Sequence, residues 1–408
     1  MADLENATAT DADPRLVDIA PAPEPPDTPV EIEAAEDATG GTRTGRPRID
    51  KYLKTVCKTQ ASDLHMKADS RGKLRVGGYI QSIKGNRLST ADIESLIFEI
   101  MTPAQIEQYK TRGSTDFAYQ MGDVARFRIN VFRQRGMTSV AARRIPFEIL
   151  SYDELHLPPV LASIAALHQG LVLVSGITGS GKSTTIAAMI EQINRTRACH
   201  IVTVEDPIEF MYTDKKAFIN QREIGLDVRD FSDALKYLMR EDPDVVLIGE
   251  LRDNETFSAA LQAAESGHLV FGTVHASGTA STITRVLELF PEDARELIRS
   301  SLVFNLQAIV SLKLLPGLRP DVPRIPAVEI MIANSTIRKL ISDRRDNDLL
   351  GVIRASYHEG MIEFGESLRK LVEQEYISSK VAYAAAPNPD ELKMRLKGIH
   401  VSGGGIIG

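Results

Sequence analysis

Residues 171–185, LVLVSGITGSGKSTT, decide the fold expected for this chain. The apolar run at 171–174 predicts a buried strand, and TTIAAMIEQI at 184–193 predicts a helix with apolar residues at helical spacing. The glycine-rich stretch between them predicts a tight loop that joins the strand to the first turn of the helix. This strand–loop–helix unit is typical of parallel α/β sheets.

The loop fits the pattern G-x-x-x-x-G-K-[ST], in which glycines let backbone N–H groups point inward and form a concave site for phosphate oxygens. Lys182 is expected to reach the β- and γ-phosphates of ATP, and Ser183 to place its hydroxyl on Mg²⁺. The positive end of the helix dipole favours phosphate at the same place. The candidate nucleotide-binding residues are Gly176, Ile177, Thr178, Gly179, Ser180, Gly181, Lys182, Ser183 and Thr184.

The 408 residues are enough for two or three domains, and 25% charged with 43% hydrophobic residues is ordinary for a soluble protein. The net charge of −7 is unevenly spread, because the first 40 residues carry eleven acids against one arginine. This segment is also rich in alanine and proline, so residues 1–47 are expected to form a disordered acidic tail. A tail that binds a partner is the alternative.

Several classes of protein are excluded by simple counts. No apolar run approaches the roughly 20 residues of a membrane-spanning helix, and no signal-peptide pattern begins the chain, so we expect a cytoplasmic protein. The two cysteines, Cys57 and Cys199, are far apart and form no C-x-x-C pair. A disulfide framework and a cysteine zinc site are therefore not expected.

A small α+β domain is expected at 48–147. Residues 74–83 predict a hairpin with Gly77 and Gly78 at the turn, 90–101 predicts a helix, and Thr102-Pro103 begins another. Strands are predicted at 115–120, 125–132 and 138–144, giving one antiparallel sheet with helices on one face.

Arginines alternate with apolar residues in ARFRINVFRQRG, which begins at Ala125, so Arg128 is expected on the outer face of its strand. Arg143 follows in the next predicted strand. The outer face is either a solvated surface, a nucleic-acid patch, or the source of arginines for a nucleotide held by a neighbouring domain. The nucleic-acid patch is disfavoured because no aromatic residue lies among the outward positions to stack on bases.

After a linker at 148–164, short apolar strands alternate with helices, which predicts a largely parallel sheet covered on both faces. These strands are expected at 171–175, 200–205, 245–250, 269–275 and 325–332. The chain beyond Pro291 is otherwise expected to be helical, at 292–314, 335–342, 346–358, 361–374 and 389–397. The ATPase-type domain is placed at 165–345, a helical region at 346–400 and a flexible tail at 401–408.

Acidic residues follow the predicted parallel strands, where ligand loops gather, and two histidines bracket one of these strands. Glu205, Asp206 and Glu209 end the strand at 200–205, and their carboxylates suit metal coordination or orientation of an attacking water. Glu250 follows an apolar strand, although Gly249 stands where many nucleotide enzymes have aspartate. His268 and His275 bracket LVFGTV, too far apart along a strand to share one metal.

In this order and spacing the motifs resemble those of the hexameric type II/IV secretion ATPases, and within them the type IV pilus retraction ATPase (PilT) family. The matching runs are ASDLH at 61–65, GITGSGKSTT at 176–185, VEDPIEF at 204–210, INQREIG at 219–225, REDPDVVLIGELRD at 240–253 and SGHLVFGTVHA at 266–276. The resemblance covers residues 50–398.

This resemblance implies a PAS-like N-terminal α+β domain, a RecA-like P-loop ATPase core and a C-terminal helical region, assembled as a homo-hexamer. It makes Glu209 the general base and Glu250 the Walker B acid near Mg²⁺. Glu205 and Asp206 belong with Glu209 to the aspartate box, and His268 and His275 to the histidine box. N-terminal arginines act at the nucleotide site in such rings, and Arg128 and Arg143 are the candidates here.

Within the family, the absence of a four-cysteine insertion and of an extra N-terminal domain favours the retraction branch. Ile177 departs from the usual proline, Ala-Ser-Gly follows His275, and the family's AIRNLIRE stretch is only partly kept at 336–343. An accessory retraction paralogue or the motor of a related secretion or assembly system therefore stays open.

The expected activity is Mg²⁺-dependent ATP hydrolysis that drives pilus retraction and twitching motility. The expected partner is an inner-membrane platform protein, with the motor peripheral at the cytoplasmic face of the membrane and no nucleic acid involved. A nucleic-acid translocase and a non-hydrolysing nucleotide sensor are the rivals. The translocase lacks a basic, aromatic groove, and the sensor is disfavoured because Glu209 and Glu250 are both present.

Overall fold

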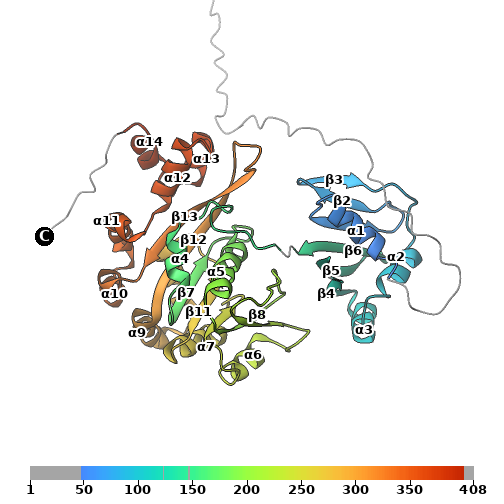
Figure 1. The fold of residues 1–408 in the computed structure, drawn as a ribbon, viewed down its shortest axis with the longest axis horizontal. Helices are drawn as coiled ribbons and strands as arrows, with labels where there is room; N and C mark the ends of the chain where they lie inside the picture. The colour runs from blue at the N-terminus through green and yellow to red at the C-terminus, as the bar shows by residue number, and fades with distance from the viewer. Residues whose placement is uncertain (1–46, 123, 146–147, 399–408) are drawn as a thin grey trace, which may run out of the picture. The chain divides into compact units, whose positions relative to one another are not determined.

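The computed structural model describes residues 47–122, 124–145 and 148–398, which form two compact units that divide after Arg144 (Figure 1). The predicted tails at 1–47 and 401–408 lie outside the described residues, apart from Pro47. Each unit is described by itself.

The first unit is an antiparallel six-stranded sheet with three helices. Its strand order is β3-β2-β1-β6-β5-β4. In chain order the elements are α1 (Asp50–Lys58), β1 (Asp63–Lys67), β2 (Lys73–Val76), β3 (Tyr79–Ser82), α2 (Thr90–Ile97), α3 (Pro103–Arg112), β4 (Ser114–Met121), β5 (Ala125–Gln134) and β6 (Met137–Ile145). The sequence did not predict α1 or β1, and α2 ends four residues before the expected end.

Local sequence explains the elements that were predicted correctly. The β2–β3 hairpin turns at Gly77 and Gly78, whose φ angles of 56° and 91° are those that glycine adopts without strain. Thr102 caps α3 and Pro103 occupies its first turn. On β5, Phe127 and Ile129 are fully buried while Arg128 is exposed, so the alternating pattern does place the arginine on the outer face.

The second unit is built on a seven-stranded sheet of order β13-β12-β7-β11-β10-β8-β9. All pairs except β12–β13 are parallel, which confirms the prediction of a largely parallel sheet. Its strands are β7 (Gly170–Ser175), β8 (His200–Glu205), β9 (Phe218–Glu223), β10 (Val245–Ile248), β11 (Leu269–Val274), β12 (Leu306–Pro316) and β13 (Arg324–Ile332).

Helices cover both faces of this sheet. Leu171 and Leu173 of β7 belong to a core formed with α6 (Phe231–Leu238), α7 (Asn254–Glu265), α8 (Thr279–Glu288), α9 (Arg295–Asn305) and α10 (Ser335–Ser342). Val172 and Val174 point into a second core with α4 (Val160–Ala165) and α5 (Lys182–Thr196). A strand with both faces buried explains the unbroken apolar run in the sequence.

The prediction of one helix at 292–314 is wrong. A short 3₁₀ turn and α9 end at Asn305, and the chain then enters β12, which pairs with β7 on one side and β13 on the other. LQAIVSLKLL is apolar enough to fill a buried helix or a buried strand, and pairing on both edges selects the strand. The polar strand β9 at the opposite edge was also not predicted.

The C-terminal helices are α11 (Leu349–Ala355), α12 (Phe364–Glu373), α13 (Ser379–Ala385) and α14 (Pro389–Leu396). Phe364, Leu368 and Leu392 pack against Leu315 and Ile325, at the turn end of the β12–β13 hairpin (Figure 1). The helical region therefore shares a core with the sheet. The stretch expected to be a linker also enters the fold, because α4 buries Leu161 and Ile164 under β7.

Candidate nucleotide site

The phosphate loop runs from the end of β7 into α5, as the sequence predicted. Gly176 has a φ of 151°, and a Cβ atom there would lie 2.7 Å from the Leu312 carbonyl oxygen and 2.3 Å from Ser180 Oγ. A side chain at this position would collide with backbone, so only glycine keeps the loop closed against β12. Gly179 and Gly181 also adopt positive φ angles, which curl the loop around its centre.

Polar groups of the loop are arranged for an anion. Lys182 is buried and its Nζ donates to the carbonyl oxygens of Gly176 (2.8 Å) and Ile177 (3.2 Å), inside the concave face of the loop. Ser180 Oγ is buried with no hydrogen-bond partner among the described residues. The N-cap residue of α5 is Gly181, which has no side chain to cap the helix. The N–H groups of the first helical turn are therefore available to phosphate oxygens. These groups fit a nucleotide phosphate.

Two carboxylates act on this lysine. Burial lowers the pKa of Lys182, and the charges of Glu250 and then Glu209 oppose that shift. The structure thus brings the lysine and both predicted catalytic glutamates into one electrostatic environment. A cation and two carboxylates at the strand ends are the minimum set for holding a metal–phosphate group and positioning water.

Glu250 lies two residues beyond the end of β10, and its Oε1 is 3.4 Å from Nε2 of His275, which follows β11. Gly249 stands where many nucleotide enzymes have aspartate, and the geometry explains the glycine. A Cβ at Gly249 would lie 3.2 Å from Glu205 Cα and from the Val204 carbonyl oxygen. The close approach of β10 to β8 therefore favours glycine, and the single acid Glu250 remains.

The aspartate box divides into a buried and an exposed part. Glu205 is 8% exposed and accepts hydrogen bonds from Thr203 Oγ1 (2.7 Å), Gln221 Nε2 (3.4 Å) and the Glu209 amide (3.5 Å). Burial raises the pKa of Glu205 to about 7, against these hydrogen bonds. Glu205 thus fixes the backbone of the loop through the Glu209 amide, whereas Glu209 itself is exposed.

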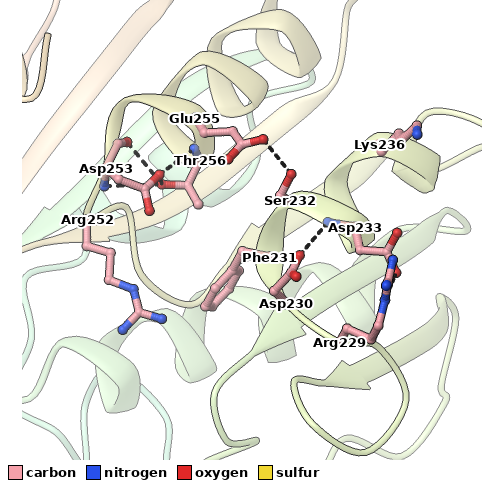
Figure 2. Close-up of a pocket in the computed structure, with 10 residues that line it drawn as sticks. All are labelled: Arg229, Asp230, Phe231, Ser232, Asp233, Lys236, Arg252, Asp253, Glu255 and Thr256. Carbon is pink, nitrogen blue, oxygen red and sulfur yellow. Dashed lines mark hydrogen bonds and ion pairs between the residues drawn. The ribbon is translucent and has the colours of Figure 1, made fainter.

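The sequence analysis missed Arg252. Its Nη2 lies 3.7 Å from Asp206 Oδ2 and its Nη1 lies 3.9 Å from Glu250 Oε2, so it joins the ends of β8 and β10. Figure 2 shows its guanidinium beside the ring of Phe231, at 5.6 Å from the ring centroid. Its position two residues after Glu250 was the available signal.

Arg252 also borders a pocket of about 490 Å³ between the first turns of α6 and α7 (Figure 2). Asp230 and Asp253 cap these helices by accepting from the amides of Asp233 and Thr256, each at 2.8 Å. Each cap satisfies one N–H group of its helix and places a carboxylate at the helix start, in contrast to α5, where Gly181 leaves that place open.

The two histidines do not meet. His275 lies beside Glu250, just after the carboxyl end of β11. His268 lies just before the amino end of the same strand, where its Nδ1 is 2.8 Å from the Ala263 carbonyl oxygen. The assignment of His268 and His275 to one histidine box stays a prediction. The spacing along the strand had already separated the pair.

Arg128 and Arg143 lie on the outer face of the first unit, on the neighbouring strands β5 and β6. Arg143 Nε donates to Oδ1 of buried Asp63 at 2.9 Å, while 71% of the Arg143 side chain stays exposed. Asp63 thus orients the guanidinium of this arginine through Nε, while most of the side chain stays exposed.

Among the described residues no group of three or more histidine, cysteine, aspartate or glutamate side chains is arranged to hold a metal ion. Ser183 and Glu250 stay the candidates for holding Mg²⁺, an ion that usually takes one or two protein ligands, nucleotide phosphates and water. None of the helices in the described part of the chain combines the length and apolar character that crossing a bilayer demands.

The family model for type II/IV secretion system proteins matches residues 42–367. The type IV pilus retraction ATPase PilT of Pseudomonas aeruginosa is 40% identical over 342 residues, 84% of this chain and 99% of that protein. The type IV pilus ATPase PilU of the same organism is 32% identical over 350 residues, 86% of this chain and 91% of that protein.

A crystal structure of the pilus retraction motor PilT with bound ADP superposes with a TM-score of 0.80 at 40% identity. The match covers 85% of this chain and 99% of that one. The matched residues 42–367 of the family model span both units and include the phosphate loop, the aspartate box and β10 with the Glu250 that follows it. The chain belongs to the family of type II/IV secretion system proteins.

Proposed function

We propose that this protein is an ATP-hydrolysing motor of a type IV pilus machine and that it drives pilus retraction. The observation that carries the proposal is the phosphate loop with Lys182 placed under the charges of Glu250 and Glu209. The names of the relatives support the biological role, and the higher identity to PilT than to PilU favours the retraction motor over the accessory paralogue.

In this proposal the loop amides and Lys182 bind the β- and γ-phosphates of ATP. Lys182 leaves the carbonyls of Gly176 and Ile177 when phosphate oxygens replace them. Ser183 and Glu250 hold Mg²⁺, partly through water, and the ion supplies charge compensation on the phosphates. Glu209 orients the attacking water and accepts its proton at a carboxylate oxygen. Buried Glu205 keeps the Glu209 backbone in place through the amide contact.

The test of this chemistry is phosphate release by the purified protein with Mg²⁺ and ATP. Glu209→Gln should retain ADP binding and lose hydrolysis by about 10²-fold or more, because it removes the base and keeps the side-chain shape. Glu288→Gln on the exposed face of α8 is the matched control and should hydrolyse ATP at the parental rate. Hydrolysis at the parental rate in Glu209→Gln would contradict the assignment of Glu209 as the base. Failure of the parental protein to bind ADP would contradict the nucleotide site itself.

The proposal includes a homo-hexamer in which Arg128 and Arg143 of one subunit complete the site of the next. Arginine suits this task because its planar fork stays charged and can bridge two phosphate oxygens. The Asp63–Arg143 contact is compatible with the choice, since it orients the guanidinium through Nε while 71% of the side chain stays exposed.

Mixing two inactive variants tests shared sites. Lys182→Ala subunits have a dead pocket and intact arginines, whereas Arg128→Ala/Arg143→Ala subunits have an intact pocket and no arginines. Mixed rings should regain ATPase activity if sites are shared. Mixed rings that form by native mass spectrometry and stay inactive would contradict the shared site or this choice of arginines.

The same proposal places the motor at the cytoplasmic face of the inner membrane, on a platform protein of the pilus machine. Deleting the gene separates retraction from assembly. Cells that keep excess surface filaments would support retraction, and cells without filaments would instead support an assembly motor.

A further inference from the structure

A chain of buried polar contacts lies directly beneath the phosphate loop. Ser175, the residue before Gly176, has its Oγ 2.6 Å from Ser311 Oγ on β12. Thr282 of α8 donates its hydroxyl to the same Ser175 Oγ at 3.0 Å. All three hydroxyl residues are 0% exposed. The start of α8 is therefore attached to the strand that carries the nucleotide loop.

The first residue of α8 is held from the other side by Glu329 of β13. Oε1 of Glu329 accepts the Thr279 amide at 2.8 Å and the Thr279 hydroxyl at 2.9 Å. Thr279 stands four residues after His275, which lies against Glu250. A displacement of the segment from His275 to Thr279 would thus act on the Glu329 carboxylate.

The second oxygen of Glu329 points to the C-terminal helices. Oε2 accepts the amide of Phe364, the first residue of α12, at 3.4 Å. Lys313 lies over the Phe364 ring at 4.4 Å from its centroid and donates to the Ala385 carbonyl oxygen at the end of α13 (2.8 Å). The polar contacts therefore continue from α8 into α12 and α13.

Packing alone does not explain an acidic residue at this position. Glu329 is only 6% exposed, and a buried carboxylate is unfavourable unless hydrogen bonds and nearby positive charge compensate it. Here the N-termini of α8 and α12 both provide that compensation. A cavity of about 380 Å³ borders Glu329, Gly278 and Phe364, which leaves the start of α8 room to move.

We propose that Glu329 couples the nucleotide site to the C-terminal helices, as a positioning residue through which the His275–Thr279 segment and α12 respond together. The inference rests on the proposed nucleotide site. In a motor of this family, it gives the C-terminal helices a nucleotide-dependent state that a partner can sense. Coupling of this kind changes the equilibrium of the remote element by about fivefold or more.

Amide hydrogen exchange of the full-length protein, with and without ADP, tests the proposal. In the parental protein, ADP should slow exchange about fivefold or more in peptides from 361–396. Glu329→Gln keeps the side-chain shape, but its amide group turns a donor toward one of the two helix N-termini. We expect the variant to bind ADP with near-parental affinity and to lose the response in 361–396.

Two further variants separate coupling from simple destabilisation. Glu366→Gln removes a carboxylate of α12 whose partners, Arg369 and Lys370, lie on the same helix, and it should keep the response. Thr282→Val removes the hydroxyl that contacts both Ser175 and the Gly278 carbonyl oxygen, so it should weaken the response even if Glu329→Gln does not fold. ADP binding, measured separately by calorimetry, reports on the nucleotide site itself.

Two results would overturn the proposal: a parental-size response in both Glu329→Gln and Thr282→Val, or an ADP-bound parental protein with unchanged exchange in 361–396. Absence of ADP binding to the parental protein would instead contradict the nucleotide site on which the inference rests.

Discussion

Glu205→Gln changes a buried carboxyl group whose ionisation opposes folding near neutral pH. In the folded protein, burial raises the pKa of Glu205 from 4.5 to about 7. The folded state therefore holds this proton between pH 4.5 and 7, where the unfolded chain releases it. The contribution of Glu205 to stability is fully present below pH 4.5 and is lost as the pH rises to about 7, so the free energy of unfolding should fall across this window.

The size of the effect follows from the size of the pKa shift. One pKa unit corresponds to about 1.4 kcal/mol, so the full shift is worth ~3 kcal/mol. The glutamine variant cannot titrate and retains an acceptor for the Thr203 hydroxyl. As the pH rises from acidic to mildly alkaline, the free energy of unfolding of Glu205→Gln should increase by ~3 kcal/mol relative to that of the parental protein. For a unit of this length that is a relative rise in melting temperature of roughly 6 to 12 °C.

Scanning calorimetry of both proteins at pH 5 and pH 8 measures this difference. Glu191→Gln is the matched control, because burial opposes ionisation of Glu191 but hydrogen bonds from Lys215, Arg195 and Asn194 outweigh it and lower its pKa. The contribution of Glu191 to stability is lost only as the pH falls below the pKa of an ordinary glutamate, which lies outside the window tested. A difference between parental and Glu205→Gln melting temperatures that stays constant from pH 5 to 8 would refute the reasoning.

Three other substitutions test the phosphate loop and the contact between α9 and α10. Lys182→Ala should lower phosphate release by about 10²-fold or more with a nearly unchanged melting temperature, since the lost contacts are to loop carbonyls; retained hydrolysis would exclude the phosphate-loop assignment. Gly176→Ala should abolish ADP binding and destabilise by about 1 to 3 kcal/mol, whereas Gly351→Ala, inside α11 with open space around it, should keep ADP binding and raise the free energy of unfolding by about 0.5 to 1 kcal/mol. Arg338→Ala removes donors from the last carbonyls of α9 and should lower the melting temperature by roughly 2 to 6 °C. Lys339→Ala, at an exposed position on the same helix, should leave the melting temperature unchanged. Equal falls in melting temperature for Arg338→Ala and Lys339→Ala would count against this cap.

The fold could be predicted where a segment's pattern had one physical interpretation. Residues 171–175 and 200–205 carry apolar runs that end in a glycine loop or a carboxylate, and both are strands. Residues 306–316 carry an equally apolar run after a helix, and only pairing with β7 and β13 determines that they form a strand. The edge strand β9 has no apolar face to reveal it.

The site shows the same limit. The phosphate-loop residues and Glu250 follow from local spacing, and the structure brings Lys182 under the charges of both predicted glutamates. Burial of Glu205 and the position of Arg252 between two strand ends depend on the order of strands in the sheet, which spacing does not provide. The separation of His268 from His275 needed only the length of a strand.

Filament shortening in living cells tests the central claim most directly. Surface filaments are labelled and their lengths are followed in a gene-deletion strain that expresses either the parental protein or Glu209→Gln. We predict that filaments shorten with the parental protein and persist at constant length with Glu209→Gln, at equal protein levels. Filaments that shorten equally well with Glu209→Gln, or that fail to form at all in the deletion strain, would contradict an ATP-driven retraction motor.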